Sequence, residues 1–215
     1  MEQQTRFLLT GSLIAGPIYI IVGIAQILTR EGFDITRHPL SFMSLGDLGW
    51  IQIANFILTG LLVIAGAIGM RRLAQSDKRL RWGALLIGIY GLGVVGGGLF
   101  VTDPALGFPP GTPDTYPQTV SWHGLLHFIF GQLGFLALIA ASFVYTRYFA
   151  TNGLRSLALF SALTGVLFLF AIMSTVATAG GEGSVWALLV LYVAVILAWI
   201  WLSTLSYHLR SELAR

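Results

Sequence analysis

The chain has 215 residues, of which 56% are hydrophobic and 10% charged, and its mean hydropathy is +0.82. A soluble domain needs a larger polar shell, so this composition indicates an integral membrane protein. Cysteine is absent, which excludes disulfides, thiolate metal sites and cysteine nucleophiles. The net charge of +3 does not indicate a nucleic-acid partner, because the cations flank apolar runs and form no basic face with interleaved aromatics.

Six apolar segments are long enough to cross a bilayer, which takes roughly 20 residues. In chain order they are Phe7–Leu28, Leu48–Met70, Trp82–Val101, Val120–Tyr145, Leu154–Thr178 and Val185–Leu205. No linker divides them. We therefore predict an all-α fold, an integral membrane bundle of six transmembrane helices that forms a single domain over residues 1–215.

The Lys and Arg residues are sorted by side. In this topology ten of the twelve lie on the side of the two termini, and Arg30 and Arg37 lie on the other side. Five of the ten crowd into one short break, at Arg71, Arg72, Lys78, Arg79 and Arg81. Because cytoplasmic loops carry the excess of Lys and Arg, we expect both termini in the cytoplasm and a location in a bacterial inner membrane.

The first long outer loop, Thr29–Asp47, leads into the second span. Ser44 followed three residues later by Asp47 fits a capping box at a helix start, which is the favoured reading of this pair. Ser41 and His38 are an alternative nucleophile and base, although no known nucleophile motif surrounds them. Asp47 and Trp50 are candidate ligand-binding residues, because both lie at the outer end of this span.

The third span is rich in glycine. Its Gly93 and Gly97 have the four-residue spacing that lets two helix backbones approach closely in lipid. We expect this span to be the central helix of the bundle, with close packing as the main role of its glycines.

The second long outer loop, Thr102–Thr119, carries four prolines between Asp103 and Asp114 and cannot continue a helix. We expect it to lie as a lid on the outer face. Long ordered loops of this kind are more often functional than merely connecting. Asp103 directly follows the third span. An ionisable group at that depth is either functional, here as a candidate catalytic residue, or a helix-end carboxylate that meets head groups or an arginine.

His123 and His127 open the fourth span four residues apart, so both lie on one helix face. Two such imidazoles bind a divalent metal such as zinc if a third ligand arrives from another segment, for which His38 and Asp103 are candidates. In the alternative, His123 lies at the interface beside Trp122, itself a candidate ligand-binding residue, while His127 forms a hydrogen bond inside the bundle.

Glu182 lies in the last outer loop. It is a candidate ligand-binding residue, as a metal ligand or a cation-attracting carboxylate, with a solvated turn acid as the ordinary alternative.

Several motifs together resemble bacterial membrane proteins of the family called domain of unknown function 998. They are Gly32–Asp34, Arg37–Ser41, Gly46–Gln52, Arg71–Arg72, Asp103–Gly111 and His123–His127. The resemblance implies a compact bundle of about six helices and supplies no reaction or substrate.

A looser similarity links the chain to the transmembrane hydrolases that include alkaline ceramidases and adiponectin receptors. Those enzymes place a Ser, an Asp and three His around zinc. The residues of these types here are Ser41 or Ser44, Asp103, His38, His123 and His127. The chain departs from that pattern in having six spans rather than seven and in carrying its His pair on the fourth.

These patterns favour an outward-facing polar pocket that binds a lipid or small amphiphile, with metal-assisted hydrolysis as one form of that function. The expected partners are membrane lipids and a small amphiphilic ligand. The alternative is a non-enzymatic accessory or structural subunit that contacts another protein through its outer loops. Converging His123, His127 and Asp103 would favour the first, and scattered polar residues would favour the second.

Overall fold

The computed structural model describes residues 1–74, 77–178 and 184–213. It is all-α, and all six predicted spans form helices that are long and apolar enough to cross a membrane. The helices are α1 (Glu2–Thr29), α2 (Trp50–Leu73), α3 (Lys78–Leu99), α4 (Trp122–Thr151), α5 (Arg155–Thr178) and α6 (Val185–Glu212), with a short 3-10 helix, η1 (Leu40–Ser44), before α2.

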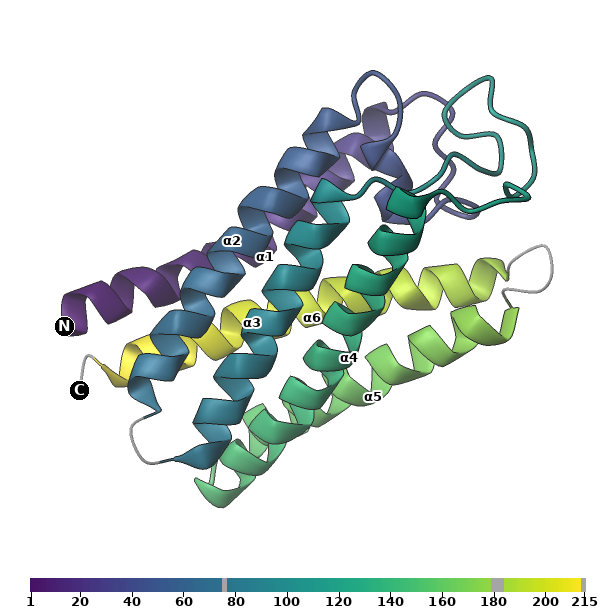
Figure 1. Ribbon diagram of the computed structural model, residues 1–215. Coiled ribbons are helices and arrows are strands. Elements are labelled where there is room, and N and C mark those ends of the chain that lie inside the picture. Colours follow the sequence, from purple (N-terminus) through teal and green to yellow (C-terminus); the bar gives the residue numbers. More distant parts are fainter. Residues whose placement is uncertain (75–76, 179–183, 214–215) are drawn as a thin grey trace.

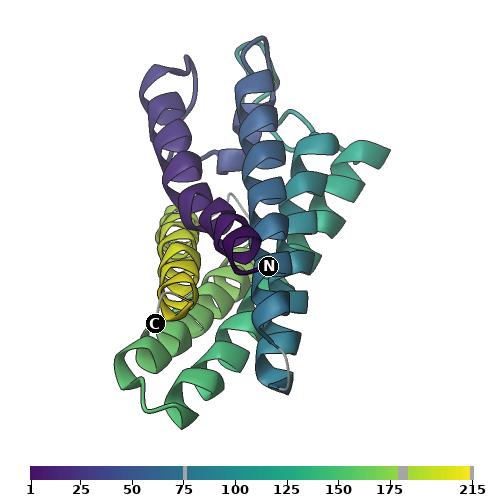
Figure 2. The ribbon, with the colours of Figure 1, turned by 90° about the vertical axis from the view of Figure 1, so that its left-hand side faces the viewer.

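The six helices form a closed ring. Each helix packs against the next one along the chain, and α6 returns to pack against α1. In Figure 1, α2, α3 and α4 run side by side while α5 and α6 cross them obliquely. Figure 2, turned by 90°, shows α1 next to α6, on the side of the bundle away from α3 and α4. The start of α1 and the end of α6 lie at one end of the bundle, and the two long loops lie at the other (Figure 1).

Close glycine contacts make α3 a central helix, as its composition predicted. A Cβ added to Gly93 would lie 2.7 Å from the Cα of Gly134 on α4. On the opposite side, one added to Gly91 would lie 3.0 Å from the carbonyl oxygen of Gly60 on α2. The distance at Gly93 is too short for any side chain, and the distance at Gly91 is tighter than most contacts that a Cβ makes, so the close approach of α2, α3 and α4 depends on glycine at these positions.

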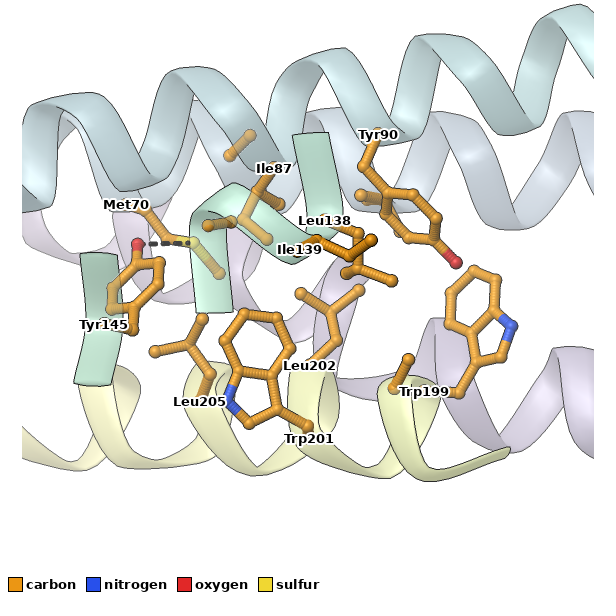
Figure 3. Close-up of a cluster of buried hydrophobic side chains, with 14 of the residues drawn as sticks. Met70, Ile87, Tyr90, Leu138, Ile139, Tyr145, Trp199, Trp201, Leu202 and Leu205 are labelled. Carbon is orange, nitrogen blue, oxygen red and sulfur yellow. Dashed lines mark hydrogen bonds between the residues drawn. The ribbon is translucent and has the colours of Figure 1, made fainter. Parts of the chain in front are cut away.

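Large aromatic side chains fill the middle of the bundle. Trp199, Trp201 and Tyr145 are almost completely buried, and Figure 3 shows them among aliphatic side chains from α2, α3, α4 and α6. Two of these rings have hydrogen-bond partners: the Tyr145 hydroxyl donates to the Met70 sulfur at 3.4 Å (Figure 3). The indole N–H of Trp201 donates to the Ser161 hydroxyl at 2.9 Å. The polar ends of Tyr145 and Trp201 are thus paired inside the apolar core.

The start of α2 differs from the sequence-based expectation. The predicted capping box of Ser44 and Asp47 does not form, because the chain first makes η1 and then a turn in which the Gly49 amide donates to the Gly46 carbonyl. Helix α2 therefore begins at Trp50, with Gly49 as a cap that has no side-chain bond. The Ser44 hydroxyl instead donates to the Ser41 carbonyl oxygen at 2.6 Å.

Candidate functional site

The two long loops, residues 30–49 and 101–121, fold over one end of the bundle, and we call them together the lid. They share a small hydrophobic core of their own, separate from the core of the bundle. Phe108 at its centre is 1% exposed and meets the Phe33 ring edge-on at 5.6 Å. Because apolar side chains of the two loops pack together, the lid is an ordered structure, as the sequence predicts for Thr102–Thr119.

His38 is the polar centre of the lid and is 2% exposed. Its Nδ1 accepts a hydrogen bond from the Asp34 amide at 2.9 Å, so its Nε2 carries the proton and donates to the Leu106 carbonyl at 2.9 Å. The Tyr192 hydroxyl of α6 donates to the His38 carbonyl oxygen. His38 therefore ties both loops of the lid to the bundle. Both of its ring nitrogens are used, which leaves neither for a metal or for general-base chemistry.

Arg30 supports the lid from below. Arg30 directly follows the last residue of α1. Its guanidinium lies over the Phe108 ring, 5.6 Å from the ring centroid, and donates to the carbonyl oxygens of Met43 and Leu45. Burial lowers the pKa of Arg30 from its ordinary value. An arginine that satisfies backbone carbonyls here keeps the end of η1 in place. Arg37, by contrast, forms an exposed ion pair with Asp114 that joins the rims of the two loops.

Asp103 is used at the start of α4. Its Oδ2 accepts a hydrogen bond from the Ser121 amide at 2.9 Å. A Cβ added to Gly124 would lie only 2.3 Å from the same oxygen, so a larger residue there would push the carboxylate away from the start of α4. Ser121 in turn caps α4 by accepting from the Gly124 amide at 3.0 Å. The carboxylate lies where the partial positive charge of a helix start stabilises it, which is the helix-end role anticipated as the alternative to catalysis.

The two histidines of α4 separate into different roles. His123 is exposed in the first turn, with Nδ1 2.7 Å from the Ser121 hydroxyl. His127 lies one turn deeper, and its Nδ1 donates to the Phe100 carbonyl oxygen at 2.7 Å, with the Gly97 carbonyl at 3.1 Å. This tautomer leaves the Nε2 of His127 as a hydrogen-bond acceptor. The hydrogen bond inside the bundle is the arrangement anticipated as the alternative to metal binding.

The proposed metal centre does not assemble. Within residues 1–74, 77–178 and 184–213, no three His, Cys, Asp or Glu side chains are grouped so that they could hold a metal ion. Two candidate third ligands are committed elsewhere, His38 to the two lid loops and Asp103 to the start of α4. A shared face on one helix brings two imidazoles near each other and cannot by itself recruit a third group.

A cavity of about 320 Å³ lies inside the bundle beneath the lid. Its walls come from η1, α1, α2, α3, α4 and α6, and they are mainly apolar. Trp199 lies in its wall with Tyr19 stacked on it at a centroid distance of 4.6 Å and Tyr90 at 5.7 Å. Ser41, His127 and Gln132 supply polar groups to the same cavity. Apolar walls with a few polar groups are the common form of a small-molecule site.

The α4 wall of this cavity is open where Gly131 lies. A Cβ added to Gly131 would meet nothing within 4 Å. Phe128, three residues earlier and also in the wall, is 59% exposed. The cavity therefore borders exposed surface of α4.

Three buried amides form a polar cluster between α1 and α2. The Gln26 amide donates to the Gln52 Oε1 at 2.7 Å, and the Asn55 amide donates to the same oxygen at 3.3 Å. Gln52 is fully buried. Polar groups inside a span are costly without partners, so this cluster holds α1 to α2 next to Tyr19, which lines the cavity.

Sequence reasoning missed the aromatic residues of the cavity wall. Tyr19, Tyr90, Tyr192 and Trp199 look like ordinary span residues in the sequence, and only the ring of helices brings them together. Gln52 and Asn55 did give a signal, as amides one turn apart inside an apolar run.

Asp47, Trp50 and Trp122 lie away from the cavity wall. Trp50 and Trp122 are 65% and 68% exposed, as expected for tryptophans at a membrane interface, and Asp47 is exposed in the lid. Glu182 lies outside the described residues.

Comparison with known proteins agrees with the resemblance seen in the sequence. No curated protein and no solved structure matches the chain. A family model described as a protein of unknown function, DUF998, matches residues 13–208, and the chain therefore belongs to this family of proteins.

Proposed function

We propose that the cavity beneath the lid binds a small amphiphile or a single lipid chain taken from the membrane. The observation that carries the proposal is the cavity itself, with its apolar walls, its few polar groups and its border with the exposed face of α4. Its volume of about 320 Å³ falls at the lower end of the range for small-molecule sites, which runs from about 300 to 1,000 Å³.

The polar groups indicate the chemistry of the ligand. In its neutral form His127 presents Nε2 as an acceptor, because Nδ1 donates its proton to the Phe100 carbonyl oxygen. Ser41 and Gln132 add a hydroxyl and a carboxamide. The cavity wall contains no Asp, Glu, Lys or Arg among the described residues. These groups suit an uncharged head group with a hydroxyl or amide, and the aromatic wall suits an acyl chain.

Binding is better supported than hydrolysis. Ser41 and His127 line one cavity and could form a nucleophile and base, but Asp103 is held by the Ser121 amide and does not orient His127. The base is oriented by backbone carbonyls instead. Metal-assisted hydrolysis also lacks a third ligand among residues of the described ranges.

The distribution of cations gives the proposed orientation. The end of the bundle that carries ten of the twelve Lys and Arg residues would face the cytoplasm of a bacterial inner membrane, with the lid outside. The amphiphile would then enter from the outer leaflet, beside Gly131.

The test is a size series at Gly131. G131A, G131L and G131F add increasing bulk to the cavity at a position where a Cβ meets nothing. Lipids that co-purify with each variant are measured by mass spectrometry, with G23L as a control because Gly23 also has no neighbour within 4 Å and does not line the cavity. We expect the amount of one co-purifying lipid class to fall as the side chain at position 131 becomes larger, and to be unchanged in G23L. Equal retention in G131F would contradict the proposal.

A further inference from the structure

A groove of about 740 Å³ lies at the opposite end from the lid, between α2 and α3. Its floor contains small residues, Ala67, Ala84 and Gly88, and its walls are apolar and exposed. At the end where α2 stops and α3 starts, the groove is bordered by Arg71, Lys78 and Arg81.

The three cations at this end are available to a ligand. All three are exposed, and none forms an ion pair with another residue in the part of the chain that the structure covers. The neighbouring carboxylate, Asp77, is engaged by Arg79, whose Nη2 lies 2.8 Å from Asp77 Oδ2. The groove therefore combines apolar walls with a net positive mouth.

The length of the groove matches one membrane leaflet. It extends along α3 from Arg81 to Leu92. At a helical rise of 1.5 Å per residue this is about 16 Å, roughly half of a hydrocarbon core about 30 Å thick. Trp82, 61% exposed beside Arg81, lies where an interfacial tryptophan belongs, between the cations and the apolar walls.

We propose that this groove is a binding site for one anionic phospholipid, with its phosphate at Arg71, Lys78 and Arg81 and an acyl chain along Gly88. Charge complementarity selects the anionic head group, because basic pockets between spans bind such head groups. The glycine floor provides room for the chain, since a Cβ at Gly88 would only just contact Ala67 at 3.7 Å. The site lies at the other end of the bundle from the lid cavity and does not depend on the function proposed for it.

The test uses the fluorescence of Trp82 in reconstituted vesicles. The full chain is placed in phosphatidylcholine with a small, equal fraction of either brominated phosphatidylglycerol or brominated phosphatidylcholine, whose bromines quench nearby indoles. The component from Trp82 is obtained by difference with W82F. We expect stronger quenching of that component by the phosphatidylglycerol probe, and equal quenching by both probes would overturn the proposal.

Matched variants separate a site from a general surface charge. R71Q/R81Q should lower the preference for phosphatidylglycerol by about fivefold for each cation removed. R147Q/R155Q removes the same charge from exposed positions on α4 and α5 and should preserve the preference. An equal loss in both double variants would overturn the proposal.

Two further experiments test the placement of the acyl chain and the identity of the anion. G88L keeps every cation and fills the groove, so it should remove the preferential quenching while thermal unfolding shows that the variant is folded. Preference retained in a folded G88L would overturn the placement of the chain. Added inorganic phosphate should leave the quenching unchanged, and displacement by phosphate would show a site for soluble anions instead.

Discussion

The Nε2 of His38 lies 2.9 Å from the carbonyl oxygen of Leu106, and this hydrogen bond joins the two loops of the lid across 68 residues of sequence. The same ring accepts a bond from the Asp34 amide, and the His38 carbonyl accepts one from Tyr192 of α6. A histidine that looks like a metal ligand or a base in the sequence is therefore the residue that fixes the cover of the cavity.

Replacing His38 with Ala should loosen the lid. The change leaves the Leu106 carbonyl and the Asp34 amide without their partner, and each unpaired buried group costs about 1–3 kcal/mol. We expect a lower midpoint of thermal unfolding in detergent and faster proteolysis within residues 101–121. H123A is the control, because His123 is exposed. Similar shifts in both variants would show that His38 has no special role.

Replacing Gly93 with Ala should separate α3 from α4. The new methyl group would lie 2.7 Å from both the Gly134 Cα and the Phe130 carbonyl oxygen, and backbone atoms cannot move aside cheaply. Overpacking of this kind costs about 1–3 kcal/mol. The measurement is thermal unfolding against G131A, which adds the same methyl group to an open position. If G93A and G131A are equally stable, the close approach is not a source of stability.

Gly124 and Asp103 should be energetically coupled. G124A places a methyl group against the Asp103 carboxylate, so it should destabilise the wild-type background and cost less in a D103A background, where the carboxylate is gone. We expect a coupling energy of about 0.5–3 kcal/mol from a double-mutant cycle of thermal or denaturant unfolding. Additive effects would mean that the carboxylate does not hold the start of α4.

Replacing Gln52 with Leu should destabilise the contact between α1 and α2. The substitution removes the oxygen that accepts from Gln26 and Asn55, and leaves two buried amides without that partner. Hydrogen bonds between membrane helices contribute about 0.6 kcal/mol on average and up to about 1.7 kcal/mol. We expect a loss within or above this range in unfolding experiments. Unchanged stability in Q52L would assign the cluster no structural role.

Hydropathy was sufficient to predict the six helices, because a bilayer imposes length and apolar composition on each span separately. The helices run beyond the predicted spans at several ends, for example α6 from Leu205 to Glu212. Hydrogen bonding within a helix continues into the interface, where apolar side chains are no longer required.

The site was harder to predict, because each polar residue of the lid has several possible partners in the sequence and one in the fold. The sequence predicts Asp103 as a catalytic group and His38 as a metal ligand, and in the fold both form hydrogen bonds with backbone groups of the lid. Backbone partners leave no pattern of side chains to detect. Ser41 and His127 do line one cavity, which follows from the packing of η1 against the bundle rather than from their spacing.

The most direct test of the proposed function is whether an amphiphile reaches Trp199, the buried tryptophan in the cavity wall. A monoacylglycerol with a brominated chain is titrated into detergent-solubilised protein, and indole fluorescence is compared among wild type, W199F and G131F. The account predicts saturable quenching of a component that disappears in W199F and is strongly reduced in G131F. Quenching that is the same in all three proteins would come from the exposed tryptophans and would contradict binding in the cavity.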